Sequence, residues 1–444
     1  MTTQNDPSVE SATVEEVPPP AEQTQGFWST MPRMFSSLRH RNYRLFFGGH
    51  ALSMVGAWAQ RIALSWLVWK LTGSKVWLGY INAIGPLPMT FLSFFGGIVA
   101  ERADRRRILY VTQSLMSVGP LAIALALAFD REMEYVNEWH LLIVAGLHGI
   151  VQAFDVPARQ AFVVNMVGRK DIANAVALNS SVFNVSRMVG SGLGAGLIAL
   201  VGAAACFAIN GLTYFALIAA LLLMRFPAAT EAQLRRASVP RHPFGGFYYV
   251  WSHKAVRATM VLLASTSILG WSFLTLLPAF VDHVYHREAG TFGVFMSVFG
   301  AGAFIGALIM AYLGYYRKRQ RLVLIGTVIF IAAVATFTVA PTWSVALAPL
   351  FFAGLGLLIA MAGINSLIQL VVNDRFRGRV MGVYATLFGG MMPVGSLLAG
   401  FMAERLSSPV AVQINIAVLA VVTAAVAVYW RRLGLNEAAR SASA

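Results

Sequence analysis

Twelve apolar runs, each long enough to cross a bilayer, follow one another from residue 43 onward. A helix needs about 20 apolar residues to span a hydrocarbon core of about 30 Å. Only 12% of the 444 residues are charged, whereas soluble proteins have about a quarter. The sequence therefore predicts an all-α membrane protein. Its expected transmembrane helices are 43–69, 76–100, 107–129, 139–165, 172–199, 202–225, 256–282, 290–315, 321–340, 343–371, 380–404 and 409–431.

The distribution of Lys and Arg predicts which side of the membrane the termini occupy. Most of the 34 Lys and Arg residues lie in the termini and in the connections of one side. The other side has Lys70, Lys75, Arg131, Arg287 and Arg405, and the spans contain Arg61, Arg159 and Arg187. Because positively charged connections stay in the cytoplasm, we expect both termini there. The net charge of +15 is then a topology signal, and no nucleic-acid partner is expected.

The long sixth connection divides the chain into two halves of six spans. We expect a disordered tail over 1–35, a bundle over 36–226, a linker over 227–254, a bundle over 255–432 and a tail over 433–444. A weak internal repeat relates residues 187–196 to residues 391–400, and each segment follows a basic turn. Transporters built from repeats bind substrate near mid-membrane between the halves.

The second connection, residues 97–109, reads GIVAERADRRRIL. It resembles the signature between helices two and three of the major facilitator superfamily, with Glu101 for the usual aspartate and Asp104 at a glycine position. Residues 38–46, 58–68, 155–162 and 377–382 are similar to a narrower branch. That branch contains enterobactin exporters, transmembrane secretion effectors and macrolide efflux pumps. The resemblance implies the major facilitator fold, two pseudo-symmetric six-helix bundles, as a monomer in a bacterial cytoplasmic membrane.

The same connection predicts a gate on the cytoplasmic side. A carboxylate such as Glu101 is stabilised by the free N–H groups at a helix N-terminus. The resemblance implies that this helix is the eleventh. The expected gate residues are Gly97, Glu101, Arg102, Asp104, Arg105, Arg106, Arg377 and Arg379. Alternatively, the arginines only fix topology and bind anionic lipid headgroups.

The fifth span contains Gly190, Ser191 and Gly194, in a segment that resembles the antiporter signature Gly-Pro-x-x-Gly-Gly of exporters. Ser191 replaces the proline, and Ala195 replaces the last glycine. In exporters this signature implies closure of the pathway towards the outside. The alternative is that small residues at this spacing simply let two helices approach closely.

Polar side chains follow one face of three helices in the first half. Ionisable side chains inside a membrane are costly, so each is a functional candidate. The stripes are His50, Met54, Ala57 and Arg61; His148, Gln152, Asp155 and Arg159; and Ser180, Asn184, Arg187 and Ser191. The second half has mainly Asn365 and Gln369. The expected substrate-cavity residues are His50, Arg61, Gln152, Asn184, Arg187, Asn365 and Gln369.

Asp155 is the only carboxylate well inside an expected span. Apolar surroundings favour the protonated form of a carboxyl group, so Asp155 is our candidate for proton coupling, tuned by Arg159 and His148. The alternative is a structural i,i+4 pair of Asp155 with Arg159. Arg61 and Arg187 either bind an anionic or strongly polar substrate at the cavity wall or donate to backbone carbonyls; both interpretations stay open.

Three classes of function remain for such a chain. The first is a proton-coupled exporter of amphipathic drug-like or siderophore-like molecules, and the second is an importer or a lysolipid or metabolite facilitator. The third is a membrane enzyme or receptor. No phosphate-binding loop, His-Glu-x-x-His or Gly-x-Ser-x-Gly element occurs in a usable context, so neither an enzyme nor a cofactor is expected. Trp58, Trp66, Trp271 and Phe273 either line the cavity or pack.

Overall fold

The computed structural model describes residues 36–129, 135–225, 245–313, 319–372 and 374–432. Regular secondary structure in these ranges is entirely helical, and twelve helical segments are long and apolar enough to cross a membrane. The expected tails over 1–35 and 433–444, most of the expected linker, and Arg131 lie outside the described residues. The prediction of twelve transmembrane helices is confirmed.

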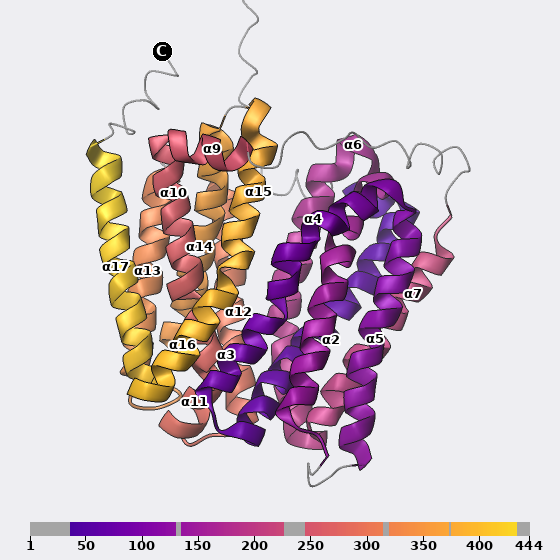
Figure 1. The fold of residues 1–444 in the computed structure, drawn as a ribbon, viewed down its shortest axis with the longest axis horizontal. Helices are drawn as coiled ribbons and strands as arrows, with labels where there is room; N and C mark the ends of the chain where they lie inside the picture. Colours follow the sequence, from indigo (N-terminus) through magenta and orange to yellow (C-terminus); the bar gives the residue numbers. More distant parts are fainter. Residues whose placement is uncertain (1–35, 130–134, 226–244, 314–318, 373, 433–444) are drawn as a thin grey trace, which may run out of the picture.

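The first six spans form one bundle (Figure 1). The fourth and fifth spans are continuous through α6 and are separated at Gly168, whose φ of 69° is readily adopted only by glycine. At the other end of the molecule, Gly73 (φ 58°) ends α2 and donates its N–H to the carbonyl of Trp69. The helices are α2 (Arg41–Thr72), α3 (Lys75–Ile84), α4 (Pro86–Arg102), α5 (Arg105–Phe129), α6 (Glu138–Val201) and α7 (Ala203–Leu223).

The last six spans form the second bundle, beside the first (Figure 1). Its first span is interrupted by one π-helical turn, η2, and ends on a second one, η3. The elements are α10 (Lys254–Ser265), η2 (Thr266–Gly270), α11 (Ser272–Ala279), η3 (Phe280–Val284), α12 (Ala289–Tyr312), α13 (Arg319–Thr338), α14 (Leu347–Val371), α15 (Asp374–Gly390), α16 (Met392–Leu406) and α17 (Ser408–Arg432).

A short helix, α9 (Gly245–Ser252), occupies the end of the segment expected to be a linker. Its Tyr249 is buried and stacks on Phe376 of α15, with ring centroids 4.9 Å apart. Phe247, Tyr248 and Trp251 of the same helix are exposed. The helix is therefore amphipathic, and its buried side packs on α15 through the pair of Tyr249 with Phe376.

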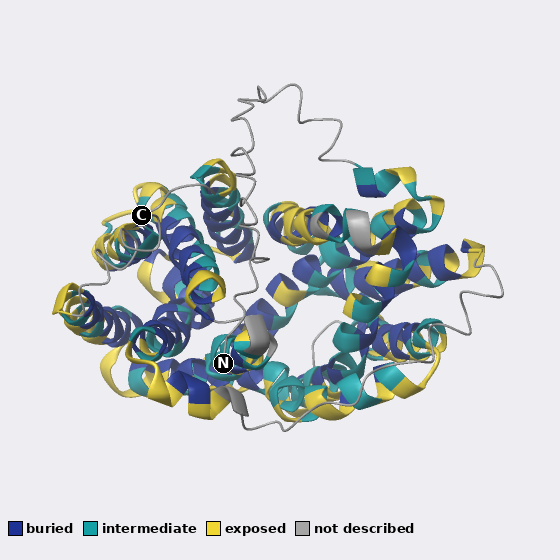
Figure 2. Ribbon diagram, turned by 90° about the horizontal axis from the view of Figure 1, so that it is seen from above, coloured by how far each residue is buried: buried dark blue, intermediate teal, exposed yellow. Residues whose placement is uncertain are grey.

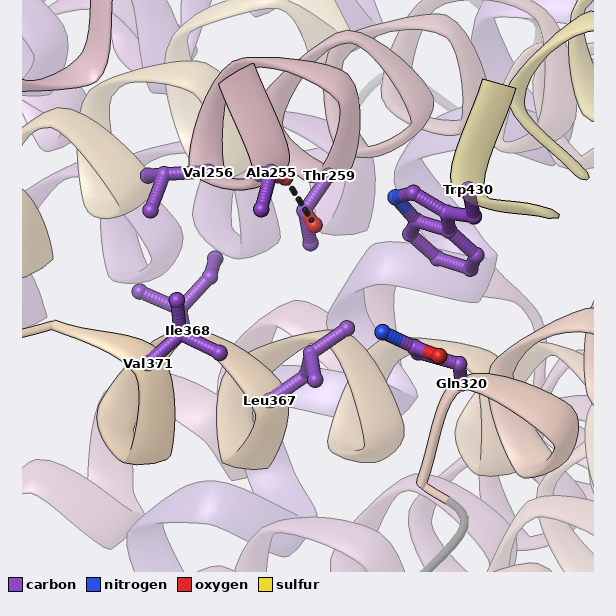
Figure 3. A pocket seen from close by; sticks show the side chains of 8 residues that line it. All are labelled: Ala255, Val256, Thr259, Gln320, Leu367, Ile368, Val371 and Trp430. Carbon is purple, nitrogen blue, oxygen red and sulfur yellow. Dashed lines mark hydrogen bonds between the residues drawn. The ribbon is translucent and has the colours of Figure 1, made fainter. Parts of the chain in front are cut away.

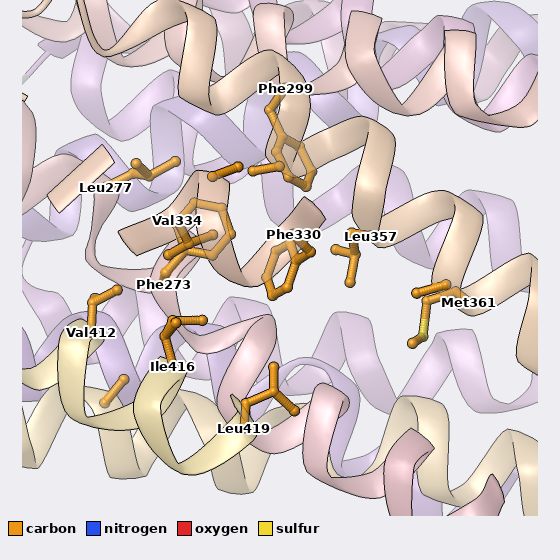
Figure 4. Packing of buried hydrophobic residues seen from close by; sticks show 14 of the residues in the cluster. Phe273, Leu277, Phe299, Phe330, Val334, Leu357, Met361, Val412, Ile416 and Leu419 are labelled. Carbon is orange, nitrogen blue, oxygen red and sulfur yellow. The ribbon is translucent and has the colours of Figure 1, made fainter. Parts of the chain in front are cut away.

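The two bundles differ in how their cores are built. Buried apolar residues of the second bundle form one continuous cluster with Phe273 near its centre, and this cluster extends to Trp58, Ile62 and Trp66 of α2 (Figure 4). The first bundle has two separate clusters, one around Phe46 and Phe162 and one around Leu67 and Phe207. Buried polar side chains lie between these two clusters. Phe273 is 1% exposed, so the packing alternative holds for it. Figure 2 shows the buried residues on the inner sides of the helices.

The described chain begins and ends on the same face, which we call the terminal face; the opposite one is the far face (Figure 1). A short 3-10 helix, η1 (Ser36–Arg39), is tied there to the turn between the two spans of α6. Ser36 Oγ and His40 Nε2 lie 2.7 and 2.8 Å from the Asp171 carboxylate. The hydrogen bonds from Ser36 and His40 lower the pKa of Asp171. Because the folded pKa is depressed, their stabilising effect persists at neutral pH and is lost only as acid protonates Asp171.

The bundles are joined mainly through the half of the molecule nearer the far face. The fifth span packs on α12 so closely that a Cβ added to Gly293 would lie 1.9 Å from Ala195 Cβ, and Ser297 Oγ donates to the Met188 carbonyl (3.0 Å). In the same way, Gly79 of α3 faces the Ser396 carbonyl of α16. Towards the terminal face, α4 and α15 diverge (Figure 1).

A close approach within the first bundle yields a stability prediction. A Cβ added to Gly96 of α4 would lie 2.0 Å from the Ala153 carbonyl oxygen of α6. Because that atom belongs to the backbone, Gly96→Ala should force the helices apart and cost about 1–3 kcal/mol. The unfolding midpoint of the purified protein measures the loss. Gly48→Ala is the matched control, since its added Cβ would meet nothing within 4 Å; equal midpoints for the two variants would contradict the prediction.

Candidate functional site

Asp155, on the fourth span, lies at the centre of the polar layer of the first bundle and is 1% exposed. Its Oδ1 accepts hydrogen bonds from Thr112 Oγ1 (2.8 Å) and Gln113 Nε2 (2.7 Å), both on α5. Its Oδ2 is 3.4 Å from Arg159 Nε, one helical turn away. The i,i+4 pair that the sequence suggested is therefore present. The sequence did not predict Thr112 and Gln113, because their role depends on how α5 is rotated relative to the fourth span.

Arg159 connects this carboxylate to α2. Its side chain is 22% exposed, and one guanidinium nitrogen lies 3.2 Å from His50 Nδ1. His50 is buried and stacks on Phe46. His148 instead packs against Tyr214 of α7, with ring centroids 6.2 Å apart. The structure thus brings His50, Asp155 and Arg159 into one chain of contacts, with His148 beside it.

A second set of polar groups joins α2 to α7. These residues were not among the predicted site residues. Asn210 Nδ2 donates to Gln60 Oε1, and Thr213 Oγ1 donates to the Asn210 carbonyl. A Cβ added to Gly56 would lie 2.5 Å from Thr213 Oγ1, so the two helices touch here. The sequence does show Gln60, Asn210 and Thr213 as neutral polar residues within apolar spans.

Arg61 and Arg187 lie apart from the Asp155 network. Arg61 is exposed, and its guanidinium is 5.1 Å from the centroid of Trp58. Arg187 is 3% exposed; it donates to Asn184 Oδ1 (3.0 Å) and lies over Phe299 of the second bundle, 5.4 Å from its centroid. Neither guanidinium donates to a backbone carbonyl in the part of the chain that the structure describes.

The glycine segment of the fifth span packs between two helices. Cβ atoms added to Gly190 and Gly194 would lie 2.5 Å from the Val55 carbonyl oxygen and 2.8 Å from Ala59 Cα of α2. Ser191 is fully buried, and its carbonyl faces Gly293 of α12. The small residues therefore allow close helix packing on both sides, one of which is the contact between the bundles.

The arginines of the second connection fasten elements within the first bundle. Arg106 donates to the carbonyls of Leu221 (2.6 Å) and Met224 (3.2 Å) at the end of α7, where helix carbonyls have no partner of their own. Arg105 donates to the carbonyls of Ala100 and Ala161. Asp104, directly before α5, accepts from the Arg106 N–H.

Glu101 makes no hydrogen bond or ion pair with a described residue of α15. Arg102 is exposed, Gly97 is unobstructed, and Arg377 and Arg379 lie on α15, with Arg379 over Phe376 (5.7 Å). Among the described residues, no hydrogen bond or ion pair joins Glu101, Arg102 or Asp104 to α15 in this conformation, so the gate stays a prediction for another conformation.

On the far face, polar contacts that the sequence did not predict join the bundles. Trp69 Nε1 donates to Asp282 Oδ2 (2.9 Å), and Lys70 Nζ is 3.7 Å from Asp282 Oδ1. The Lys75 N–H donates to Glu404 Oε2 (2.9 Å). The two halves are thus in direct contact on this face.

The polar residues of the second bundle form a smaller group. Gln369 donates to Asn365 on α14, and both side chains are accessible. A small pocket also lies in this bundle near the terminal face, apart from all predicted site residues (Figure 3). Its lining residues are Ala255, Val256, Thr259, Gln320, Leu367, Ile368, Val371 and Trp430.

Comparison with solved structures defines the class of protein. A bacterial homolog of the human lysosomal transporter Spinster superposes with a TM-score of 0.71, covering 88% of this chain and 97% of that chain, at 12% identity. The nucleoside transporter NupG gives a TM-score of 0.68 and covers 89% and 98%, at 11% identity. The chain has the major facilitator fold, as its second connection suggested.

The chain belongs to the transmembrane secretion effector family of the major facilitator superfamily, whose model matches residues 33–444. It is 23% identical to a staphyloferrin A transporter of Staphylococcus aureus, over 81% of this chain and 89% of that one. It is 27% identical to the multidrug efflux pump Tap of Mycolicibacterium fortuitum, over 77% and 84%. Macrolide efflux protein A of Streptococcus pyogenes is 21% identical, over 83% and 92%. The protein is a multi-pass membrane transporter and not an enzyme.

The ion pair of Asp155 with Arg159 yields a prediction about stability. Arg159→Met leaves a buried carboxylate without its cation and should cost roughly 3–5 kcal/mol. Adding Asp155→Asn should recover most of that loss, because the uncompensated charge is gone. Unfolding midpoints of the wild type, both single variants and the double variant measure the coupling, with Arg159→Lys as a charge-preserving control. A double variant no more stable than Arg159→Met would refute the idea.

Proposed function

We propose that this protein is a proton-coupled exporter that moves amphipathic small molecules out of the bacterial cytoplasm by alternating access. Three curated relatives, two efflux proteins and a siderophore transporter, support outward transport of small molecules. The single observation that carries proton coupling is Asp155, a carboxylate closed to solvent inside the membrane and held by side chains of two helices.

The contacts between the bundles support an inward-open state. The terminal face has most of the Lys and Arg residues, so we infer that it is cytoplasmic. The bundles touch at the far face through Asp282 and Glu404 and separate towards the terminal face. A substrate would then enter from the cytoplasm and leave after the far-face contacts have opened and the gate around Glu101 has closed.

The surroundings of Asp155 suit both of its protonation states. As a carboxylate, it accepts from Thr112 and Gln113 and faces Arg159. As a carboxylic acid, it needs an acceptor for its own proton. Gln113 Oε1 is buried without a hydrogen-bond partner, and a half-turn of the Gln113 amide would place it towards Asp155. The proton taken up by Asp155 from outside would be released to the cytoplasm, with His50 and Arg159 on the path to solvent.

An importer or a facilitator of the same fold is the second candidate. The fold alone does not separate the directions. The packing of Gly190, Ser191 and Gly194 on α2 and α12 favours export only through the signature that this segment resembles. Direction is therefore measured together with coupling.

Transport into inside-out proteoliposomes tests the proposal. With an acidic lumen, purified full-length protein should accumulate at least one of ethidium, erythromycin and 5-carboxyfluorescein, because protons leaving the lumen drive substrate in. Asp155→Asn should lower gradient-driven accumulation about tenfold or more but retain exchange of labelled for unlabelled substrate. Asp171→Asn is the matched control, because Asp171 accepts hydrogen bonds from Ser36 and His40 at the terminal face. Undiminished accumulation by Asp155→Asn would rule out coupling through this residue, and net flow only in the opposite direction would rule out export.

The prediction that both termini lie in the cytoplasm has a separate test. Fusing green fluorescent protein to Ala444 should give fluorescent cells, because that protein folds in the cytoplasm, whereas an alkaline phosphatase fusion at the same position should be inactive. The inverse pattern would place the termini outside and reverse the proposed pathway. A fusion of alkaline phosphatase after Thr72, in the connection at the far face, is the positive control.

A further inference from the structure

Two arginines within the spans of the first bundle have no carboxylate partner. Neither Arg61 nor Arg187 takes part in any ion pair between described residues; those pairs are His40–Asp171, Lys70–Asp282, Asp104–Arg107 and Asp155–Arg159. Asp155, the acidic residue buried in these spans, already has Thr112, Gln113 and Arg159 as partners. Two positive charges are therefore left without a counter-ion inside an apolar bundle.

The Arg187 guanidinium also has too few hydrogen-bond acceptors among the described residues. Its side chain is 3% exposed, and one guanidinium nitrogen donates to Asn184 Oδ1. Its Nε is buried with no hydrogen-bond partner. Phe299 offers the face of a ring but no acceptor. Taking a guanidinium out of water costs several kcal/mol unless an opposite charge or acceptors compensate it. An acceptor from outside the described protein would remove that cost.

Arg61 supplies the second positive charge, and its exposed side chain is accessible to a ligand. It is exposed although it lies well inside α2, and it makes no hydrogen bond to a described residue. Trp58 links it to the turn of the fifth span that follows Arg187, since a Cβ added to Gly190 would lie 2.8 Å from Trp58 Cβ. Trp58 lies beneath the Arg61 guanidinium and meets Phe183 edge-on, with centroids 5.6 Å apart. An apolar aromatic wall therefore adjoins the pair of cations.

We propose that Arg61 and Arg187 form an anion-binding subsite for a substrate that joins a carboxylate to an aromatic or apolar body. This inference rests on the proposed function and narrows its substrate class. Arginine matches the two oxygens of a carboxylate with two parallel N–H donors. The body of the substrate packs against Trp58 and Phe183, and two positive charges disfavour organic cations. Because Arg187 lies over Phe299 of α12, the bound anion sits at the junction of the two bundles.

Binding to the purified full-length protein tests this without requiring transport. The probe is 5-carboxyfluorescein, followed by fluorescence anisotropy in phosphatidylcholine nanodiscs, with 1-naphthoate and 1-naphthylmethylammonium as competitors of equal shape and opposite charge. Naphthoate should compete, and the ammonium compound should not. Arg187→Gln and Arg61→Gln should each weaken the Kd about tenfold or more, the value of one hydrogen bond to a charged group. Arg61→Lys should retain part of the affinity.

A control variant and several outcomes that would contradict the inference complete the binding experiment. Arg257→Gln removes an arginine from the surface of α10 and should leave the Kd unchanged. If Arg187→Gln does not fold, the exposed Arg61 still provides the test. Equal competition by both naphthyl compounds, or a change below twofold in both variants, overturns the inference. Weaker probe binding in discs containing phosphatidylglycerol would assign the arginines to a lipid headgroup and also overturn it. Outward transport of ethidium but not carboxyfluorescein would refute the anion subsite while leaving the exporter intact.

Discussion

The ion pair between Asp155 and Arg159 sets the conditions that the rest of the first bundle has to meet. A carboxylate that is 1% exposed needs donors at both oxygens. The cation comes from the next turn of the same span, and two further donors come from α5. Supplying these groups places a layer of polar side chains across the bundle. That layer separates its apolar core into two clusters, one towards each face.

In the described part of the second bundle the buried polar side chains, such as Thr275, Ser396 and Asn415, are neutral, and the apolar core is one cluster that reaches α2 of the first bundle. The bundles therefore contribute differently to the molecule: one contains the buried charges, and the other is a well-packed apolar body that rests against it. Their contact along the fifth span and α12 is made by small residues, by the Arg187 guanidinium over Phe299 and by a hydrogen bond from Ser297 to the Met188 carbonyl. A contact of this kind is close but commits few side chains, so it suits two bodies that change their relative tilt.

The sequence predicted the number of spans, the major facilitator fold and the Asp155–Arg159 pair. Each of these depends on local information: span length, a contiguous signature, or a separation of four residues along one helix. Thr112, Gln113 and Asn210 escaped prediction because their roles depend on how neighbouring helices are rotated. The contacts of Lys70 with Asp282 and of Lys75 with Glu404 join residues more than two hundred positions apart. No local pattern encodes those contacts, and they depend on which conformation the protein adopts.

The aromatic stack between α9 and α15 has a mechanical consequence. Tyr249 is held against Phe376, while Phe247, Tyr248 and Trp251 of the same short helix are exposed at the edge of the bundle. Aromatic side chains of this kind reside at the level of lipid headgroups. A displacement of α15 that left α9 behind would break the stack. We therefore expect α9 to move with α15 as one unit, so that the position of α15 is coupled to an anchor outside the bundle.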